Sequence, residues 1–146
     1  MISVPAAARS DYLLAREYLS RDGSERRLFE RLDRSARRFH LHVNHRNDDH
    51  FDPNTDTIAW DPYSALRTTR GGTQSPALGL GHEVAHAVEA PRREAALASR
   101  ALAAYDDAEE RRVIRGSERH AARTLGEGVR FDHRGRTYRV PTPVSR

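Results

Sequence analysis

The chain has 146 residues, of which 25 are basic and 21 acidic, for a formal net charge of +4. This length fits one domain, residues 1–146, with a hydrophobic core of its own. The absence of cysteine excludes disulfide bonds and thiolate metal sites. No apolar run is long enough to span a membrane, so we expect no membrane partner.

All of the basic residues are arginine, and an arginine-rich surface can bind the phosphates of nucleic acid. The arginine pairs lie close to Asp or Glu, however, as at Arg26-Arg27 and Arg111-Arg112, which is typical of solvated helix faces. No aromatic stacking pattern accompanies them. We therefore expect no nucleic-acid partner. An arginine-rich nucleic-acid-binding or interaction domain is the alternative from a different functional class.

Residues 1–38 are predicted to form a helical N-terminal part. A first helix is expected over Asp11 to Leu19, closed by Ser20 to Gly23. Ser24 is expected to cap a second helix that reaches about Phe39. Apolar residues of this second helix follow the spacing of a buried helix face: Leu28, Phe29, Leu32, Ala36 and Phe39. Both helices are interpreted as packing elements.

The hydrophobic pattern then changes to a period of two, which predicts β-strands. Residues 39–44 form one expected strand, with apolar side chains on one face and polar side chains on the other. Residues 46–56 are expected to be a loop, and residues 57–60 a second strand beside the first. A polar strand face and a loop explain the local histidines without a second metal site: His40, His42, His45 and His50.

Residues 67–74 contain two adjacent glycines and polar side chains, which predicts a mobile connection suited to a substrate entrance. The connection leads into a helix expected over 76–89. Ser75 can cap this helix, Pro76 suits its first position, and a proline follows its end.

This expected helix carries His82, Glu83 and His86. Residues four apart share one helix face, with Cβ atoms about 6 Å apart, so the two histidines can bind one cation. With the glutamate they form the His-Glu-x-x-His pattern of zinc peptidases, in which the glutamate is the general base. Gly79 and Gly81 each lower helix propensity by about 1 kcal/mol relative to alanine. We therefore expect another group to lie close to that backbone.

Further elements are expected downstream: a helix over 93–105, a helical turn capped by Asp107, a helix over 118–125 that ends at Gly126, a hairpin over 129–140 and a tail over 141–146. A hydrolytic zinc ion needs a third protein ligand and an open position for water. The candidates are Glu109, Glu110, Glu118 and His120. Glu110 is also explained as the capping-box partner of Asp107, and Glu118 as an exposed carboxylate in a first helical turn. Spacing alone does not separate these candidates.

The run from Gly81 to Ala87, followed by Glu109 to Gly116, resembles the NleD-like effector metallopeptidases of bacterial secretion systems. More distantly, it is similar to clostridial neurotoxin light chains. The resemblance covers about residues 75–133. It implies that Glu110 is the third zinc ligand and that Glu109 supports it.

The resemblance also implies which residues assist the transition state. It places an arginine at Arg130 and, three residues later, a position that is tyrosine in the family and His133 here. Tyr138 competes with His133 for this role. The chain departs from the family at Val113, where the family has threonine, and at Arg115, where it has glycine.

The expected fold is therefore α+β and zincin-like, with a small mixed sheet packed beside the motif helix. The expected function is a zinc-dependent endopeptidase that hydrolyses a target-cell protein. Glu83 would take a proton from water and pass it to the leaving amine. Arg130, with His133 or Tyr138, would donate hydrogen bonds to the oxyanion.

The resemblance further implies a secreted or injected bacterial effector or toxin domain that acts in the cytosol of the target cell. The first ten residues lack the features of a signal peptide, so delivery by a secretion system is expected. Expected partners are a protein or peptide substrate and a cognate immunity protein or secretion-system parent polypeptide. A chain without lysine would also escape ubiquitination in a eukaryotic cell. A housekeeping peptidase that cleaves a repressor is a further alternative.

Overall fold

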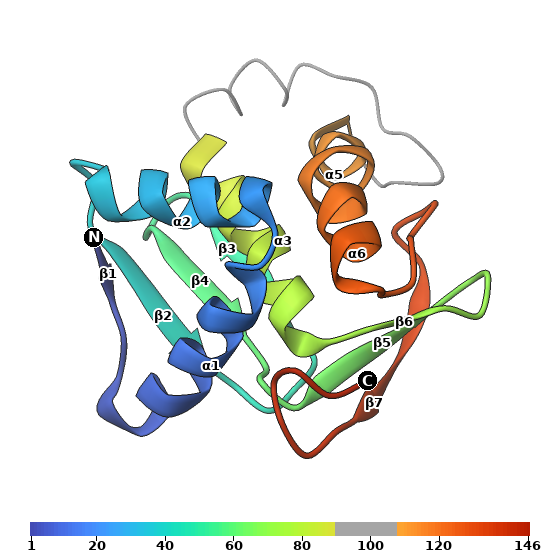
Figure 1. Cartoon of the computed structure of the whole chain (residues 1–146). Helices are drawn as coiled ribbons and strands as arrows, with labels where there is room; N and C mark the ends of the chain where they lie inside the picture. The colour runs from blue at the N-terminus through green and yellow to red at the C-terminus, as the bar shows by residue number, and fades with distance from the viewer. Residues whose placement is uncertain (90–107) are drawn as a thin grey trace.

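Two β-sheets and a group of helices give this protein an α+β fold (Figure 1). The computed structural model describes residues 1–89 and 108–146. The helical segments are η1 (Ala6–Ala8), α1 (Arg9–Leu19), α2 (Gly23–Arg34), α3 (Pro76–Glu89), α5 (Ala108–Val113), η3 (Ile114–Glu118) and α6 (Arg119–Leu125). The strands are β1 (Ile2–Ser3), β2 (Phe39–Val43), β3 (His50–Asp52), β4 (Thr57–Trp60), β5 (Ser64–Thr68), β6 (Thr73–Gln74) and β7 (Gly135–Arg139).

The larger sheet has the strand order β1-β2-β4-β3. Strands β1, β2 and β4 run parallel, and β3 is antiparallel to β4. The predicted strands over 39–44 and 57–60 are confirmed as β2 and β4, and they are neighbours. The predicted loop over 46–56 is wrong in its middle, because β3 pairs with β4 there. This strand has three residues and only Phe51 is apolar, so no alternating pattern announces it.

Helices α1, α2 and α3 pack together on one face of the larger sheet (Figure 1). The core lies between these helices and the sheet. Its largest fully buried apolar side chains come from both layers: Leu19, Leu32, Phe39, Ile58, Trp60, Leu78 and Leu80. The opposite face of the sheet carries the exposed side chains of His40 and His42. The predicted polar strand face is therefore confirmed.

Helix α1 agrees with the predicted first helix, but α2 is shorter than predicted and has another cap. Asp22, and not Ser24, caps it, because the Asp22 carboxylate accepts hydrogen bonds from backbone N–H groups of the first turn. The helix ends at Arg34, because Ser35 has an extended backbone with ψ of 139°. Phe39 matched the apolar spacing of the predicted helix, but it is buried because it lies on the inner face of β2.

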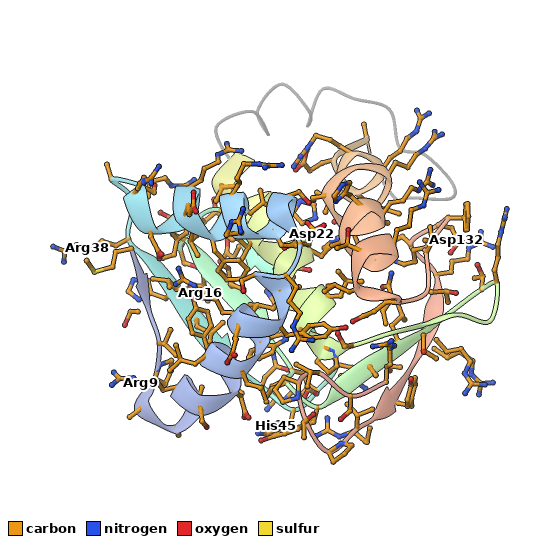
Figure 2. All side chains as sticks on the ribbon, in the orientation of Figure 1. Arg9, Arg16, Asp22, Arg38, His45 and Asp132 are labelled. Atoms are coloured by element: carbon orange, nitrogen blue, oxygen red, sulfur yellow. The ribbon has the colours of Figure 1, made fainter. Side chains whose placement is uncertain are left out.

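The second sheet is antiparallel, with the strand order β6-β5-β7. The predicted connection over 67–74 is not irregular, because β5 and β6 form a hairpin there. Its turn is held from outside. The Arg70 guanidinium lies 3.8 Å from the centroid of the Phe131 ring. Thr69 donates a hydrogen bond to Asp132 at 2.9 Å, and Figure 2 shows Asp132 beside this turn.

The predicted hairpin over 129–140 is also wrong, because only β7 is a strand and its partner is β5. The two strands approach closely at Gly135, where a Cβ atom would lie 2.5 Å from Cδ1 of Leu66. The turn signal at Arg134-Gly135 therefore marks the start of a strand whose partner lies far away in the sequence.

The tail over 141–146 packs against the start of α3. The backbone O of Pro143 accepts a hydrogen bond from the N–H of Ala77 at 2.8 Å, and Val144 contacts the core. The N-terminal part over 1–38 is helical apart from β1, which joins the larger sheet. In the part of the chain that the structure describes, no helix has the length and apolar character needed to cross a membrane. The predicted helix over 93–105 and the Asp107 cap lie outside the described residues.

Candidate metal centre

The motif helix α3 spans Pro76–Glu89, which confirms its predicted bounds. Ser75 caps it as expected, since its hydroxyl accepts a hydrogen bond from the N–H of Leu78 at 3.3 Å. The buried carboxylate of Glu127 holds this cap in place. It accepts hydrogen bonds from the N–H and the hydroxyl of Ser75, both at 2.7 Å. The start of α3 is thus fixed, and with it the direction of the side chains that follow.

Two carboxyl groups lie against the glycines of α3. A Cβ atom on Gly81 would lie 2.4 Å from Oε2 of Glu25, and one on Gly79 would lie 3.1 Å from Oδ2 of Asp49. Glu25 is 0% exposed, so a side chain at position 81 would require this buried carboxyl to shift. The close approach expected from these glycines is therefore confirmed, and both approaching groups are acidic.

His82 and His86 meet Glu110, which lies in the first turn of α5. Nε2 of His82 lies 3.0 Å from Oε2 of Glu110, and Nε2 of His86 lies 3.1 Å from Oε1. The two Nε2 atoms are 3.0 Å apart. Both histidines are buried, and Glu110 is partly exposed. These three residues can hold a metal ion, because their ligand atoms all lie within 4.8 Å of one another.

The other ring nitrogen of each histidine has a carboxylate of its own. Nδ1 of His82 lies 2.7 Å from Oε2 of Glu118, and Nδ1 of His86 lies 3.1 Å from Oε1 of Glu109. An ionised carboxylate only accepts hydrogen bonds, so with a metal on Nε2 the remaining ring proton would lie on Nδ1, toward its carboxylate. The resemblance implied a supporting role for Glu109. The same role for Glu118 was not predicted.

Glu118 reaches His82 because the helix is irregular between α5 and α6. Two helical segments meet at a kink in η3, where Gly116 has a non-helical φ of −96° and ψ of −110°. In a regular α-helix two turns take about seven residues, so Ser117 would lie on the same face as the ligand of α5. The kink changes the direction of the residues that follow it, and Glu118 contacts His82 instead. Glu118 is 1% exposed, and the predicted exposed position is therefore wrong.

An arginine holds each of the two supporting carboxylates. Arg130 donates hydrogen bonds to both oxygens of Glu118, at 2.9 and 2.5 Å. Arg112 donates to both oxygens of Glu109, also at 2.9 and 2.5 Å. Two-point pairing of this kind fixes the orientation of a carboxylate and stabilises its ionised form. Each histidine ring is therefore oriented by an arginine–glutamate pair.

These contacts change the protonation of the cluster. Burial opposes a charge on His82, but its hydrogen bonds with Glu110 and Glu118 outweigh burial and raise the pKa of His82 to about 10. Burial likewise opposes ionisation of Glu110, yet its hydrogen bonds with the two histidines lower the pKa of this carboxyl. The metal-free cluster therefore holds a proton at neutral pH. A metal must displace this proton when it binds.

A cavity of about 270 Å³ opens beside His82, the one candidate ligand among its lining residues. Side chains from α3, β5, β7 and the loop before β3 line it, and Glu83, Arg130 and His133 are among them. The Glu83 side chain is 8% exposed, and its Oε1 lies 3.9 Å from Nε2 of His82. The Glu83 carboxylate therefore lies near a ligand atom and lines the cavity, where a general base could reach water.

His133 lies at the ligand cluster, whereas Tyr138 does not. Nε2 of His133 is 3.4 Å from Oε2 of Glu110, and its ring stacks on that of His82 with centroids 6.5 Å apart. On β7, alternate residues including Thr137 line the cavity, so Tyr138 points to the other face of the sheet. There its ring lies 5.9 Å from the Arg67 guanidinium.

The remaining histidines lie elsewhere. Nδ1 of His120 contacts Asp22 at 2.7 Å, where the start of α2 meets α6 (Figure 2), so it is not the third ligand. His42 and His50 flank Ala59 from opposite sides of β4, which separates their side chains. Within residues 1–89 and 108–146, no second group of His, Asp and Glu is placed to hold a metal.

Two imidazole nitrogens and one carboxylate oxygen form a donor set that could hold a metal ion. Two imidazole nitrogens and a carboxylate oxygen are the ligands of many hydrolytic zinc sites, which keep a fourth position open. The separations of 3.0 and 3.1 Å are close to the distance of about 3.3 Å between ligands in a tetrahedral site with bonds of about 2.0 Å. The chain has no cysteine, so softer thiolate chemistry is excluded.

Comparison of the chain with protein-family models, curated proteins and solved structures gave no match. No relative therefore assigns a role to the metal centre. Its geometry and the local resemblance of the motif are what bear on its function.

Proposed function

We propose that this chain is a zinc-dependent endopeptidase with a zincin-like fold. The observation that carries the proposal is the convergence of His82, His86 and Glu110, with Glu83 beside them at the mouth of a cavity. Metal-bound histidines usually donate their other ring N–H to a carboxylate, and Glu118 and Glu109 occupy these positions at His82 and His86. The mixed sheet beside α3 is consistent with the proposed fold.

A bound zinc ion would supply Lewis acidity, which activates water and polarises a peptide carbonyl. The Glu83 carboxylate can take a proton from water and return it to the leaving amine. His133 faces the same space and can donate a hydrogen bond to the developing oxyanion. Arg130 directs its Nε and Nη2 atoms to Glu118, so we assign it the positioning of that carboxylate.

We further propose that this peptidase is an effector or toxin domain that acts on a protein in the cytosol of a target cell. This part rests on the resemblance of the motif to effector metallopeptidases, together with the absence of lysine from the chain. Delivery by a secretion system and a cognate immunity protein or parent polypeptide as partner belong to the same proposal.

The test is to compare the wild-type protein with Glu83→Gln. Purified wild-type protein should contain one zinc ion per chain, and it should generate new N-termini in bacterial or human cell lysates, detected by mass spectrometry. Glu83→Gln should retain zinc but lose about 100- to 10,000-fold in cleavage rate, because it removes a base and no ligand.

Two further variants make this test specific. Glu17→Gln removes an exposed carboxylate from α1 and should leave zinc content and cleavage unchanged. His82→Ala should lose both. Full activity in Glu83→Gln would exclude the proposed mechanism, and stoichiometric zinc in a variant lacking both His82 and His86 would exclude the site.

A further inference from the structure

We propose that Asp49 selects a cationic group, a guanidinium or an ammonium, on the substrate residue beside the scissile bond. This inference rests on the proposed peptidase function and names the class of substrate. Asp49 lines the same cavity as the metal ligand His82 and the proposed base Glu83. It comes from the loop before β3, a part of the chain that carries no recognisable motif.

The Asp49 carboxylate is held in a fixed position. Its Oδ1 accepts a hydrogen bond from the N–H of Asp61 at 2.7 Å. Its Oδ2 lies against Gly79, 3.1 Å from where a Cβ atom would be. Gly79 is one helical turn before Glu83, and a turn of α-helix is about 5.4 Å long. The Asp49 carboxylate therefore lies about one turn from the proposed base, along the wall of the cavity.

Within the described residues no arginine or histidine forms an ion pair with Asp49, although the charge of His82 acts to lower its pKa. Arg139 donates a hydrogen bond at 2.8 Å to Asp61, the residue whose N–H binds Asp49, so this arginine is already paired with another carboxylate. The arginine of the cavity, Arg130, is bound to Glu118. Asp49 has no hydrogen bond or ion pair with any arginine or histidine of the described chain. Its Oδ2 is left as an acceptor at the cavity.

The surroundings of Asp49 favour a positive partner. Burial raises the pKa of Asp49 to about 8, although the hydrogen bond from Asp61 acts against this, and the carboxylates of Glu83 and Asp61 add to the rise. At neutral pH the carboxyl without a cationic partner therefore keeps its proton for most of the time, and a cation bound beside it would favour the ionised form. A charge-assisted hydrogen bond in such a site is about twice as strong as a neutral one.

A second metal is not the cation we infer. The only group of potential ligands found in residues 1–89 and 108–146 is His82, His86 and Glu110, and Asp49 does not belong to it. One carboxylate with one available oxygen cannot complete a metal site. It is sufficient to orient a single ammonium or guanidinium group.

Asp49→Asn is a suitable variant because the amide oxygen can still accept the hydrogen bond from Asp61, while the charge is removed. Asp48→Asn is the matched control. Asp48 is the exposed neighbour of Asp49 and does not line the cavity. Its substitution by Asn makes the same chemical change one residue away. Thermal melts of both variants should match that of the wild-type protein.

Binding is measured first, because it does not require turnover. Zinc-loaded protein is titrated calorimetrically with Nα-acetyl-arginine hydroxamate and with Nα-acetyl-citrulline hydroxamate, which differ in side-chain charge and share the zinc-binding group. The arginine ligand should bind about 10- to 100-fold more tightly to the wild-type protein and to Asp48→Asn. Asp49→Asn should bind the two ligands equally. Equal binding by the wild-type protein overturns the proposal.

A second pair of ligands separates the two sources of charge. Norleucine hydroxamate has a free α-ammonium group, and Nα-acetyl-norleucine hydroxamate does not. If the wild-type protein prefers the ligand with the free α-ammonium group and Asp49→Asn abolishes this preference, Asp49 binds the amino terminus of the substrate. A preference confined to the arginine ligand assigns it to a side chain. A preference that persists in Asp49→Asn overturns the role of Asp49 in either case.

Cleavage then separates this inference from the proposed function. Wild-type protein is incubated with a peptide library that contains internal arginine and lysine, and the cleavage sites are sequenced by mass spectrometry. Cleavage beside basic residues that weakens in Asp49→Asn supports both proposals. Cleavage without such a preference overturns the role of Asp49 and leaves the peptidase standing. Charge-selective hydroxamate binding without any cleavage overturns the peptidase and leaves the cation subsite standing.

Discussion

Oε2 of Glu118 lies 2.7 Å from Nδ1 of His82, and the same carboxylate receives two hydrogen bonds from Arg130. This contact fixes both the tautomer and the orientation of the imidazole ring. It links α3 to the irregular turn between α5 and α6, over 36 residues of sequence. The position of the first proposed zinc ligand therefore depends on a residue outside the motif.

Glu118→Gln should weaken zinc binding about 10- to 100-fold, as is typical for loss of a partner behind a metal-bound histidine. The amide removes the negative charge that accepts from both the imidazole and Arg130. Zinc affinity is measured by titration against a chromophoric chelator, with Glu17→Gln as the control for loss of an exposed carboxylate. An unchanged affinity would mean that Glu118 only neutralises Arg130.

Gly81→Ala should destabilise the protein, although alanine normally stabilises a helix by about 1 kcal/mol relative to glycine. The added methyl group would overlap the buried carboxyl of Glu25, and overpacking of this kind costs about 1 to 3 kcal/mol. The free energy of unfolding is measured in urea for Gly81→Ala alone and in a Glu25→Ala background. The loss should shrink in that background, because space is then available. A single variant more stable than the wild-type protein would contradict the contact.

Glu25 should make stability depend on pH. Burial raises the pKa of this carboxyl to about 8, with the nearby Asp22 and Glu118 adding to the rise, from an ordinary value of 4.5. The folded state thus binds the proton more tightly than the unfolded state, so stability should fall as pH rises from about 4.5 to about 8. Urea unfolding of the metal-free protein is measured across this pH range. The free energy of unfolding of Glu25→Gln should rise relative to that of the wild-type protein as pH increases. A constant difference between the two proteins would rule out this titration.

His133→Ala should lower kcat about 100- to 1000-fold with zinc retained, if His133 donates to the oxyanion as proposed. Tyr138→Phe is the matched control and should leave kcat unchanged, because Tyr138 lies on the face of β7 away from the cavity. Zinc content and kcat are measured on a peptide that the wild-type protein cleaves. A loss of turnover in Tyr138→Phe with none in His133→Ala would reverse the assignment.

Local signals determined several elements from the sequence. The bounds of α3 follow from a capping serine, an N-terminal proline and the proline after its end, all within a few residues. The left-handed conformation of Gly126 ends α6 for a similarly local reason. The alternation of apolar residues predicted β2 and β4. Each of these signals acts over one or two turns of helix or the length of one strand.

Elements that depend on distant partners were missed, as β3 was, or were assigned the wrong partner, as β7 was within the predicted hairpin over 129–140. Strand β3 is too short to show a pattern, and β7 begins at what reads locally as a hairpin turn. Both exist because another strand supplies their hydrogen bonds: β4 for β3 and β5 for β7. The hairpin of β5 and β6 was read as mobile, since the Phe131 ring that holds its turn is about 60 residues away.

The sequence by itself placed His82 and His86 on one face of a helix with Glu83 beside them, because helical spacing fixes which side chains are neighbours. Only the tertiary structure decided what meets them. The two glycines indicated a close approach, but not that it would come from Glu25 and Asp49. Glu118 reaches His82 because the helix is kinked at Gly116, which changes the face that the following side chains occupy. Such a change depends on packing across the whole fold, and residue spacing does not encode it.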